Sequence, residues 1–198
     1  MFLSLLIYNR KYSSNRLNIP HNFLGFFSSA PPIKLNYLGH GLGELATGIA
    51  CGPLIVLGSY YVQAQRVSYE ALWASIPVGL LVAAVLYINE FPDYEADKAV
   101  GKNTLTVVLG RQRAVWGYIA LLVASYGVIV VGIVLGVFPY TLLLALLTLP
   151  LANRGIQGAL RFPSDTPKLV STNAVTVQLH LLIGLLLCGG YVIAMFLP

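Results

Sequence analysis

Long runs of apolar residues, separated by short polar segments, fill most of the chain from about residue 45 onward. Five of these runs approach the roughly 20 residues with which an α-helix crosses the hydrocarbon core of a bilayer. They lie at 45–64, 71–89, 114–135, 140–160 and 173–197, and Pro150 predicts a kink in the fourth. Because backbone polar groups in lipid must be paired internally, the runs are expected to be helices. The pattern predicts an all-α transmembrane bundle of about five spans.

The first 30 residues show a weaker pattern. The apolar stretch at 1–8 is too short to span a membrane, and the stretch at 17–30 is interrupted by Pro20, His21 and Asn22. The basic residues follow the first apolar stretch, whereas in a signal peptide they precede it. We therefore predict no element for residues 1–22 and expect 23–198 to form one membrane domain.

Composition identifies the solvent of this chain as lipid. Hydrophobic residues make up 57% of the sequence and charged residues only 10%, against roughly 25% charged residues in a soluble domain. The mean hydropathy of +0.77 agrees with an integral membrane protein. The net charge of +5 does not indicate nucleic acid binding, because the basic residues are spread over loops and no nucleic-acid motif accompanies them.

The placement of the 12 Lys and Arg residues predicts the orientation of the bundle. Only Arg66 falls between the first and second spans, and none lies near Pro139 or at the C-terminus. The others fall on the opposite side of the bundle: Arg10, Lys11, Arg16, Lys34, Lys98, Lys102, Arg111, Arg113, Arg154, Arg161 and Lys168. By the positive-inside rule, this second side faces the cytoplasm of a multi-pass cell-membrane protein.

The polar loop at 90–113 is where we expect the chemistry of the chain. Asn89, Asp93 and Asp97 follow one another at intervals of four residues, so in a helix they would share one face. The two Asp carboxylates could then share a hard divalent cation, as binding of a diphosphate through Mg²⁺ requires. With Glu90 and Glu95, four acids fall within eight residues at the membrane boundary. Such a concentration of acids needs solvent, metal or Lys partners.

Basic residues in the same loop complement these acids. Lys98, Lys102, Arg111 and Arg113 could each bind phosphate oxygens, and Gly101 permits a close backbone turn. The alternative interpretation is a solvated loop whose mixed charges cap two helices, because a lone DxxxD pattern is a weak signal. The preceding Asn and the following GKNTL and LGR sequences favour the binding site.

Three sequence segments resemble a known family. The run NEFPDYEADKAVGKNTLTVVLGRQRA resembles the second aspartate-rich motif of the UbiA-type membrane prenyltransferases, and APPIKLNYLGHGLGE and GPLIVLGSYYVQ resemble the same family. The likeness is strongest to the branch that prenylates 1,4-dihydroxy-2-naphthoate in menaquinone biosynthesis, and it covers residues 23–198. It implies a nine-helix bundle that transfers a polyprenyl group from its diphosphate to an aromatic acceptor.

The resemblance also implies roles for individual residues. Asp93 and Asp97 would be the catalytic metal ligands and would hold Mg²⁺, which stabilises the departing diphosphate. Asn89 would orient these carboxylates or join the coordination shell. The residues implied in binding the diphosphate are Lys34, Lys102, Arg111 and Asn89.

Two departures from the family pattern limit what the resemblance implies. No Asp precedes Asp93, so the first aspartate-rich motif is absent, and the chain is expected to be the incomplete, C-terminal portion of the fold. Ser28 stands where relatives commonly carry Tyr. Two alternatives to a truncated enzyme therefore stay open: a noncatalytic membrane module that binds prenyl diphosphate or quinone, and one half of an enzyme completed by a separate N-terminal half.

Polar and small residues inside the last span form a stripe at roughly helical spacing. Asn173, Thr176, His180 and Gly184 could line an acceptor cavity, but hydrogen bonding between helices and close packing around Gly184 are the favoured interpretation. Glu44, at the start of the first span, is expected to be stabilised by the helix dipole and receives no catalytic role.

Overall fold

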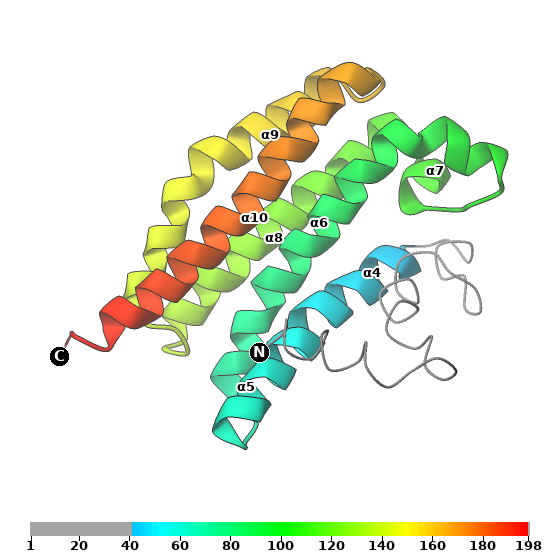
Figure 1. The fold of residues 1–198 in the computed structure, drawn as a ribbon. Helices are drawn as coiled ribbons and strands as arrows, with labels where there is room; N and C mark the ends of the chain where they lie inside the picture. Colours follow the sequence, from blue (N-terminus) through cyan, green and yellow to red (C-terminus); the bar gives the residue numbers. More distant parts are fainter. Residues whose placement is uncertain (1–40, 198) are drawn as a thin grey trace, which may run out of the picture. The chain divides into compact units, whose positions relative to one another are not determined.

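The computed structural model describes residues 41–197. The predictions for 1–22, Ser28 and Lys34 therefore lie outside the described residues. All regular structure within 41–197 is helical, as Figure 1 shows, which confirms the all-α prediction. The helices are α4 (Leu42–Ile49), η1 (Ala50–Leu54), α5 (Ile55–Ala64), α6 (Tyr69–Ala99), α7 (Leu105–Leu109), α8 (Arg111–Val134), η2 (Tyr140–Thr148), α9 (Leu149–Arg161) and α10 (Thr166–Ala194).

Five helical segments among the described residues are long and apolar enough to cross a membrane. The first combines α4, η1 and α5 into one segment of 23 residues, Leu42–Ala64. Pro53 lies in its middle, where η1 is a π-helical turn. Proline has no backbone N–H to donate to the preceding turn, which accounts for the local change of helix type. The segment ends at Gln65, whose φ of 53° is left-handed.

Helix α6 is longer than the hydrophobic pattern predicts. Its 31 residues span about 46 Å at 1.5 Å per residue, more than the roughly 30 Å of a hydrocarbon core. Ser68 caps its start by accepting a hydrogen bond from the Ala71 backbone N–H at 3.3 Å. The hydrophobic pattern predicts that this span ends at Asn89 and that a loop follows from Glu90, but the helix continues to Ala99. The onset of polarity marks the membrane boundary and not the end of the helix.

The first, third and fifth spans pack against α6. Helix α6 contacts α4, α8 and α10, and α10 also contacts η2 and α9. The apolar interior includes the fully buried Tyr87, Phe91 and Tyr118. In the fourth span the helix changes from 3-10 to α form at Leu149, directly before Pro150, where the sequence predicted a kink.

Side-chain hydrogen bonds between helices account for much of the polar stripe on α10. Thr176 shares a hydrogen bond of 2.7 Å with Tyr118 on α8 and donates to the Thr172 carbonyl. The amides of Asn173 and Asn89 also meet, at 2.6 Å. These contacts confirm the predicted hydrogen bonding between helices. Close packing around Gly184 is not found, because a Cβ there would meet nothing within 4 Å, and Nδ1 of His180 has no partner among the described residues.

Asp165 caps the N-terminus of α10. Its carboxylate accepts from the Lys168 backbone N–H at 3.2 Å and pairs with the Lys168 Nζ at 2.8 Å. These hydrogen bonds from Lys168 hold the pKa of Asp165 below its ordinary value.

Candidate functional site

The residues of the aspartate-rich motif, Asn89, Asp93 and Asp97, all lie on the last turns of α6. Asn89 and Asp93 are exposed, whereas Asp97 is buried, with 8% of its surface accessible. Asn89 lies on the side of α6 that meets α10, because its side-chain amide meets that of Asn173 at 2.6 Å. Asn89 therefore lies where α6 packs against α10.

A glycine turn at the end of α6 brings Lys102 onto Asp97. Gly101 has a φ of 70°, and the turn is closed by the Gly101 N–H on the Lys98 carbonyl at 3.2 Å and the Lys102 N–H on the Asp97 carbonyl at 2.9 Å. This is the hydrogen-bond pattern of a Schellman helix end. The Lys102 Nζ then donates to both Asp97 carboxylate oxygens, at 3.2 and 3.1 Å. The expectation that an acid of this motif needs a Lys partner is confirmed for Asp97.

Arg111, at the start of α8, is held against the same end of α6. Its Nε donates to the Phe91 carbonyl at 3.2 Å, and its guanidinium lies 4.8 Å from the centre of the Tyr94 ring. A looser ion pair of 3.8 Å joins it to Glu95. Arg111 also borders a polar pocket of about 410 Å³ that includes Arg113. The guanidinium is thus fixed near the motif while part of its hydrogen-bonding capacity is used within the protein.

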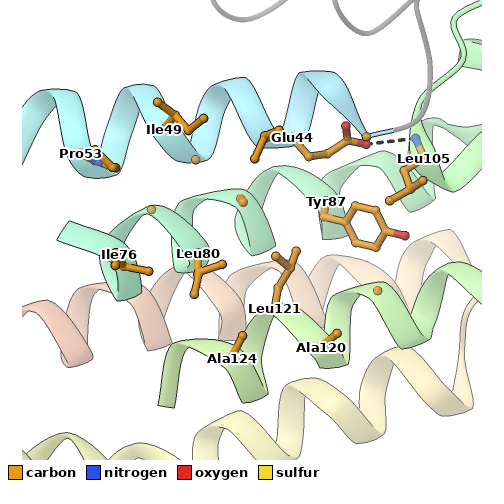
Figure 2. Close-up of a pocket in the computed structure, with 16 residues that line it drawn as sticks. Glu44, Ile49, Pro53, Ile76, Leu80, Tyr87, Leu105, Ala120, Leu121 and Ala124 are labelled. Carbon is orange, nitrogen blue, oxygen red and sulfur yellow. Dashed lines mark hydrogen bonds between the residues drawn. The ribbon is translucent and has the colours of Figure 1, made fainter. Parts of the chain in front are cut away.

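Two buried acids that the sequence analysis did not assign to the site anchor the loop between α6 and α8. Glu44 on α4 accepts the Leu105 backbone N–H at 3.0 Å, drawn in Figure 2, and Glu90 accepts the Thr106 hydroxyl at 3.1 Å. Glu90 is only 4% exposed. A local pattern could not reveal the first contact, because its partners are 61 positions apart. Together with Thr104, which caps α7, these contacts fix the segment that carries Lys102.

The structure brings the predicted site residues together only in part. Asp97 and Lys102 are in direct contact, and Arg111 lies at the same end of α6. Asn89 and Asp93 lie further back along the helix, where Asn89 contacts Asn173 of α10 and Asp93 is exposed. Within residues 41–197, no group of three or more His, Cys, Asp or Glu side chains is placed to hold a metal ion. The described oxygen donors of the motif are two carboxylates and one amide.

Comparison with known proteins gives a family and several relatives. The UbiA prenyltransferase family matches residues 2–170. The chain is 32% identical to 2-carboxy-1,4-naphthoquinone phytyltransferase of Synechocystis over 85% of its own length and 54% of that protein. It is 29% identical to 1,4-dihydroxy-2-naphthoate octaprenyltransferase of Bacillus subtilis, over 87% of the chain and 55% of that protein.

The chain thus spans about half the length of the curated relatives it matches. No solved structure gives a significant match. The family match nevertheless covers most of the chain and includes the whole of the aspartate-rich segment, the glycine turn and Arg111. The chain belongs to the UbiA prenyltransferase family.

Proposed function

We propose that this chain acts in the transfer of a polyprenyl group from its diphosphate to an aromatic acceptor, 1,4-dihydroxy-2-naphthoate, in menaquinone biosynthesis. Family membership and the names of the relatives support the reaction and the acceptor class. The proposed location of the site rests on the contact between Asp97 and Lys102 at the end of α6. This contact supports the proposal because a carboxylate, which we propose as a cation ligand, lies beside an ammonium group, which we propose as a phosphate ligand.

The donor set suits a magnesium ion bound together with a diphosphate. Prenyltransferases of this family are generally dependent on a divalent metal. Mg²⁺ in proteins is commonly held by one or two carboxylates, with substrate phosphates completing its shell. Asp93 and Asp97 would supply the carboxylates, and Asn89 an amide oxygen. When bound, the ion would neutralise charge on the departing diphosphate.

The basic residues of the chain would complete the diphosphate site. Lys102 is already turned towards Asp97, so its Nζ can exchange a carboxylate oxygen for a phosphate oxygen without moving the backbone. Arg111 would contribute a second positive charge from the start of α8, held in place by Phe91 and Tyr94. Lys34, outside the described residues, is proposed as a third diphosphate ligand by resemblance.

One observation favours a second candidate function. Among the described residues, no group of three or more His, Cys, Asp or Glu side chains gathers around the motif, so a metal bound there depends on ligands from the substrate or from another segment. The chain would then bind prenyl diphosphate or quinone without turnover, or would act with a separate N-terminal half that supplies further ligands.

Prenyl transfer by the full chain tests the proposal. The assay uses proteoliposomes with Mg²⁺, geranylgeranyl diphosphate and 1,4-dihydroxy-2-naphthoate, without and with the co-expressed part of the B. subtilis relative that this chain does not match. We expect turnover that is lost in Asp93→Ala and in Asp97→Ala and kept in Glu70→Ala, which removes an exposed acid at the opposite end of α6.

The outcomes separate the candidates. Turnover only with the added part supports the split enzyme. Turnover that survives in both Asp variants would refute the metal assignment. If neither preparation turns over, direct binding of radiolabelled geranylgeranyl diphosphate decides: Mg²⁺-dependent binding supports the noncatalytic module, and no binding rejects the diphosphate site itself.

A further inference from the structure

A cavity of about 570 Å³ lies between α4, η1, α6 and α8 (Figure 2). Its volume falls within the roughly 300–1,000 Å³ typical of small-molecule sites. Small residues on three helices leave the space open, among them Gly48 on α4, Ala83 on α6 and Ala120 on α8. An apolar space of this size would forfeit many dispersion contacts if it stayed empty, so an apolar molecule in the bilayer is favoured to enter it.

The cavity has a polar group at one end. Of its lining residues, only Glu44 and Tyr87 have polar side chains, and both lie at the end covered by Leu105, as Figure 2 shows. Tyr87 is 0% exposed, and its hydroxyl has no hydrogen-bond partner among the described residues. A buried hydroxyl without a partner is unusual, and it is satisfied when a ligand oxygen reaches it. The other end, near Pro53 and Ile76, is wholly apolar.

This cavity is separate from the proposed diphosphate site. Asn89 lies on the side of α6 that meets α10, whereas Tyr87 lies against α8, where a Cβ at Gly117 would come within 2.6 Å of the Tyr87 hydroxyl oxygen. No Lys, Arg or His lines the cavity, and a carboxyl group of Glu44 borders its polar end. Unlike the end of α6, the cavity therefore disfavours an anionic head group.

We propose that this cavity binds a prenylated quinone or quinol. A ring oxygen would meet the Tyr87 hydroxyl, while the ring and the first isoprene units lie along the apolar walls of α4, α6 and α8. Such a ligand is uncharged and largely apolar, and its oxygens lie on the ring at one end of the molecule, in keeping with a cavity whose polar side chains lie at one end. The choice of this lipid class rests on the proposed function, since a prenylated naphthoquinone is the kind of molecule that the reaction leads to.

Binding of a short-chain tritiated menaquinone to the full chain in lipid nanodiscs tests the proposal without any need for turnover. We expect saturable binding that Ala120→Leu or Ala124→Leu abolishes by filling the cavity. Tyr87→Phe should weaken binding by about fivefold to tenfold, the effect of losing one neutral hydrogen bond. Two matched controls should bind like the wild type: Ala64→Leu, exposed at the end of α5, and Tyr126→Phe, whose hydroxyl contacts Thr148 instead.

Three results would overturn the proposal. One is an absence of saturable binding in nanodiscs whose controls elute as folded protein. Another is a combined result: squalane, a hydrocarbon without oxygen, competes with menaquinone as well as unlabelled menaquinone does, and Tyr87→Phe does not change the affinity. It would show that the polar end of the cavity does not recognise the quinone oxygen. The third is loss of menaquinone binding in Lys102→Ala, which would assign the ligand to the diphosphate site. Because only binding is measured, the test does not depend on the proposed function. Quinone binding by a chain without transferase activity would still support the proposed quinone site, and a lack of binding by an active chain would still refute it.

Discussion

At the scale of single residues, the contact between Asp97 and Lys102 has the clearest consequence. The Lys102 side chain is largely buried and reaches both Asp97 carboxylate oxygens, so its ammonium is held in one orientation. Preorganised charges of this kind need little rearrangement to bind a phosphate. Lys98 is close in sequence but points elsewhere, with its Nζ 5.9 Å from the centre of the Tyr94 ring.

Lys102→Ala is therefore expected to weaken diphosphate binding. Removal of one charged hydrogen-bond donor should raise the KM, or the Kd where there is no turnover, for geranylgeranyl diphosphate by about tenfold to a hundredfold. Lys98→Ala is the matched control and should change the constant less than twofold, because Lys98 is exposed. Titration with the radiolabelled diphosphate measures both, and equal effects of the two substitutions would remove the special role of Lys102.

Glu90 gives a second residue-scale expectation, for stability. Its Oε2 accepts from the Thr106 hydroxyl, while its Oε1 has no partner among the described residues. Thr106→Val would leave the buried carboxyl without this donor and should lower the free energy of unfolding by about 1–3 kcal/mol. Thr166→Val, at an exposed position, should change it by less than about 0.5 kcal/mol. Denaturant titration in detergent micelles measures both changes. An unchanged free energy of unfolding in Thr106→Val would show that the hydrogen bond from Thr106 is not needed to bury the Glu90 carboxyl.

At the scale of elements, the crossing of the first span over α6 depends on glycine. A Cβ at Gly52 would lie 2.7 Å from both the Gly79 Cα and the Ser75 carbonyl oxygen, which are backbone atoms that cannot turn aside. Small residues of this kind let two membrane helices approach closely. The same approach forms one wall of the cavity, since Gly48 and Gly79 both line it.

Gly52→Ala should therefore separate the two helices and lower the free energy of unfolding by about 1–3 kcal/mol, the usual cost of overpacking. Gly58→Ala, two turns later on the same span, is the control. A Cβ there meets nothing within 4 Å, so the change should be neutral or stabilising by up to about 1 kcal/mol. Thermal unfolding in detergent, followed by circular dichroism, compares them. A Gly52→Ala protein as stable as the wild type would show that the crossing tolerates a wider spacing.

The elements also show how far the sequence predicts this structure. Apolar runs of about 20 residues locate all five spans, because lipid leaves a helix as the only economical structure for such a run. The hydrophobic pattern predicts the end of α6 ten residues too early, because hydropathy reports the membrane boundary and Gly101 is the local signal that ends the helix. The contacts of Glu44 with Leu105 and of Glu90 with Thr106 depend on tertiary packing, which no local pattern contains.

At the scale of the whole molecule, the alternation of the five spans sorts the loops into two sets. The loops that follow α6 and α9 lie on one side, with the aspartate-rich end of α6, and the loops that follow α5 and α8 lie on the other. The first set carries Lys102, together with Lys98 and Arg161 at the adjoining helix ends, whereas Arg66 is the one Lys or Arg in the second set. By the positive-inside rule, we propose that the first side is cytoplasmic, where soluble diphosphates and naphthoates are available.

Labelling of single cysteines tests this orientation. Cys51 and Cys188 are first replaced by Ala, since both are free thiols. Val67→Cys, in the exposed loop before α6, should react with a membrane-impermeant maleimide in intact bacterial cells. Ser164→Cys, in the exposed loop before α10, should react only in inverted vesicles. The reverse pattern would place the Asp97 and Lys102 pair outside the cell, away from the substrates it is proposed to bind, and would refute the cytoplasmic orientation together with the proposed supply of diphosphate.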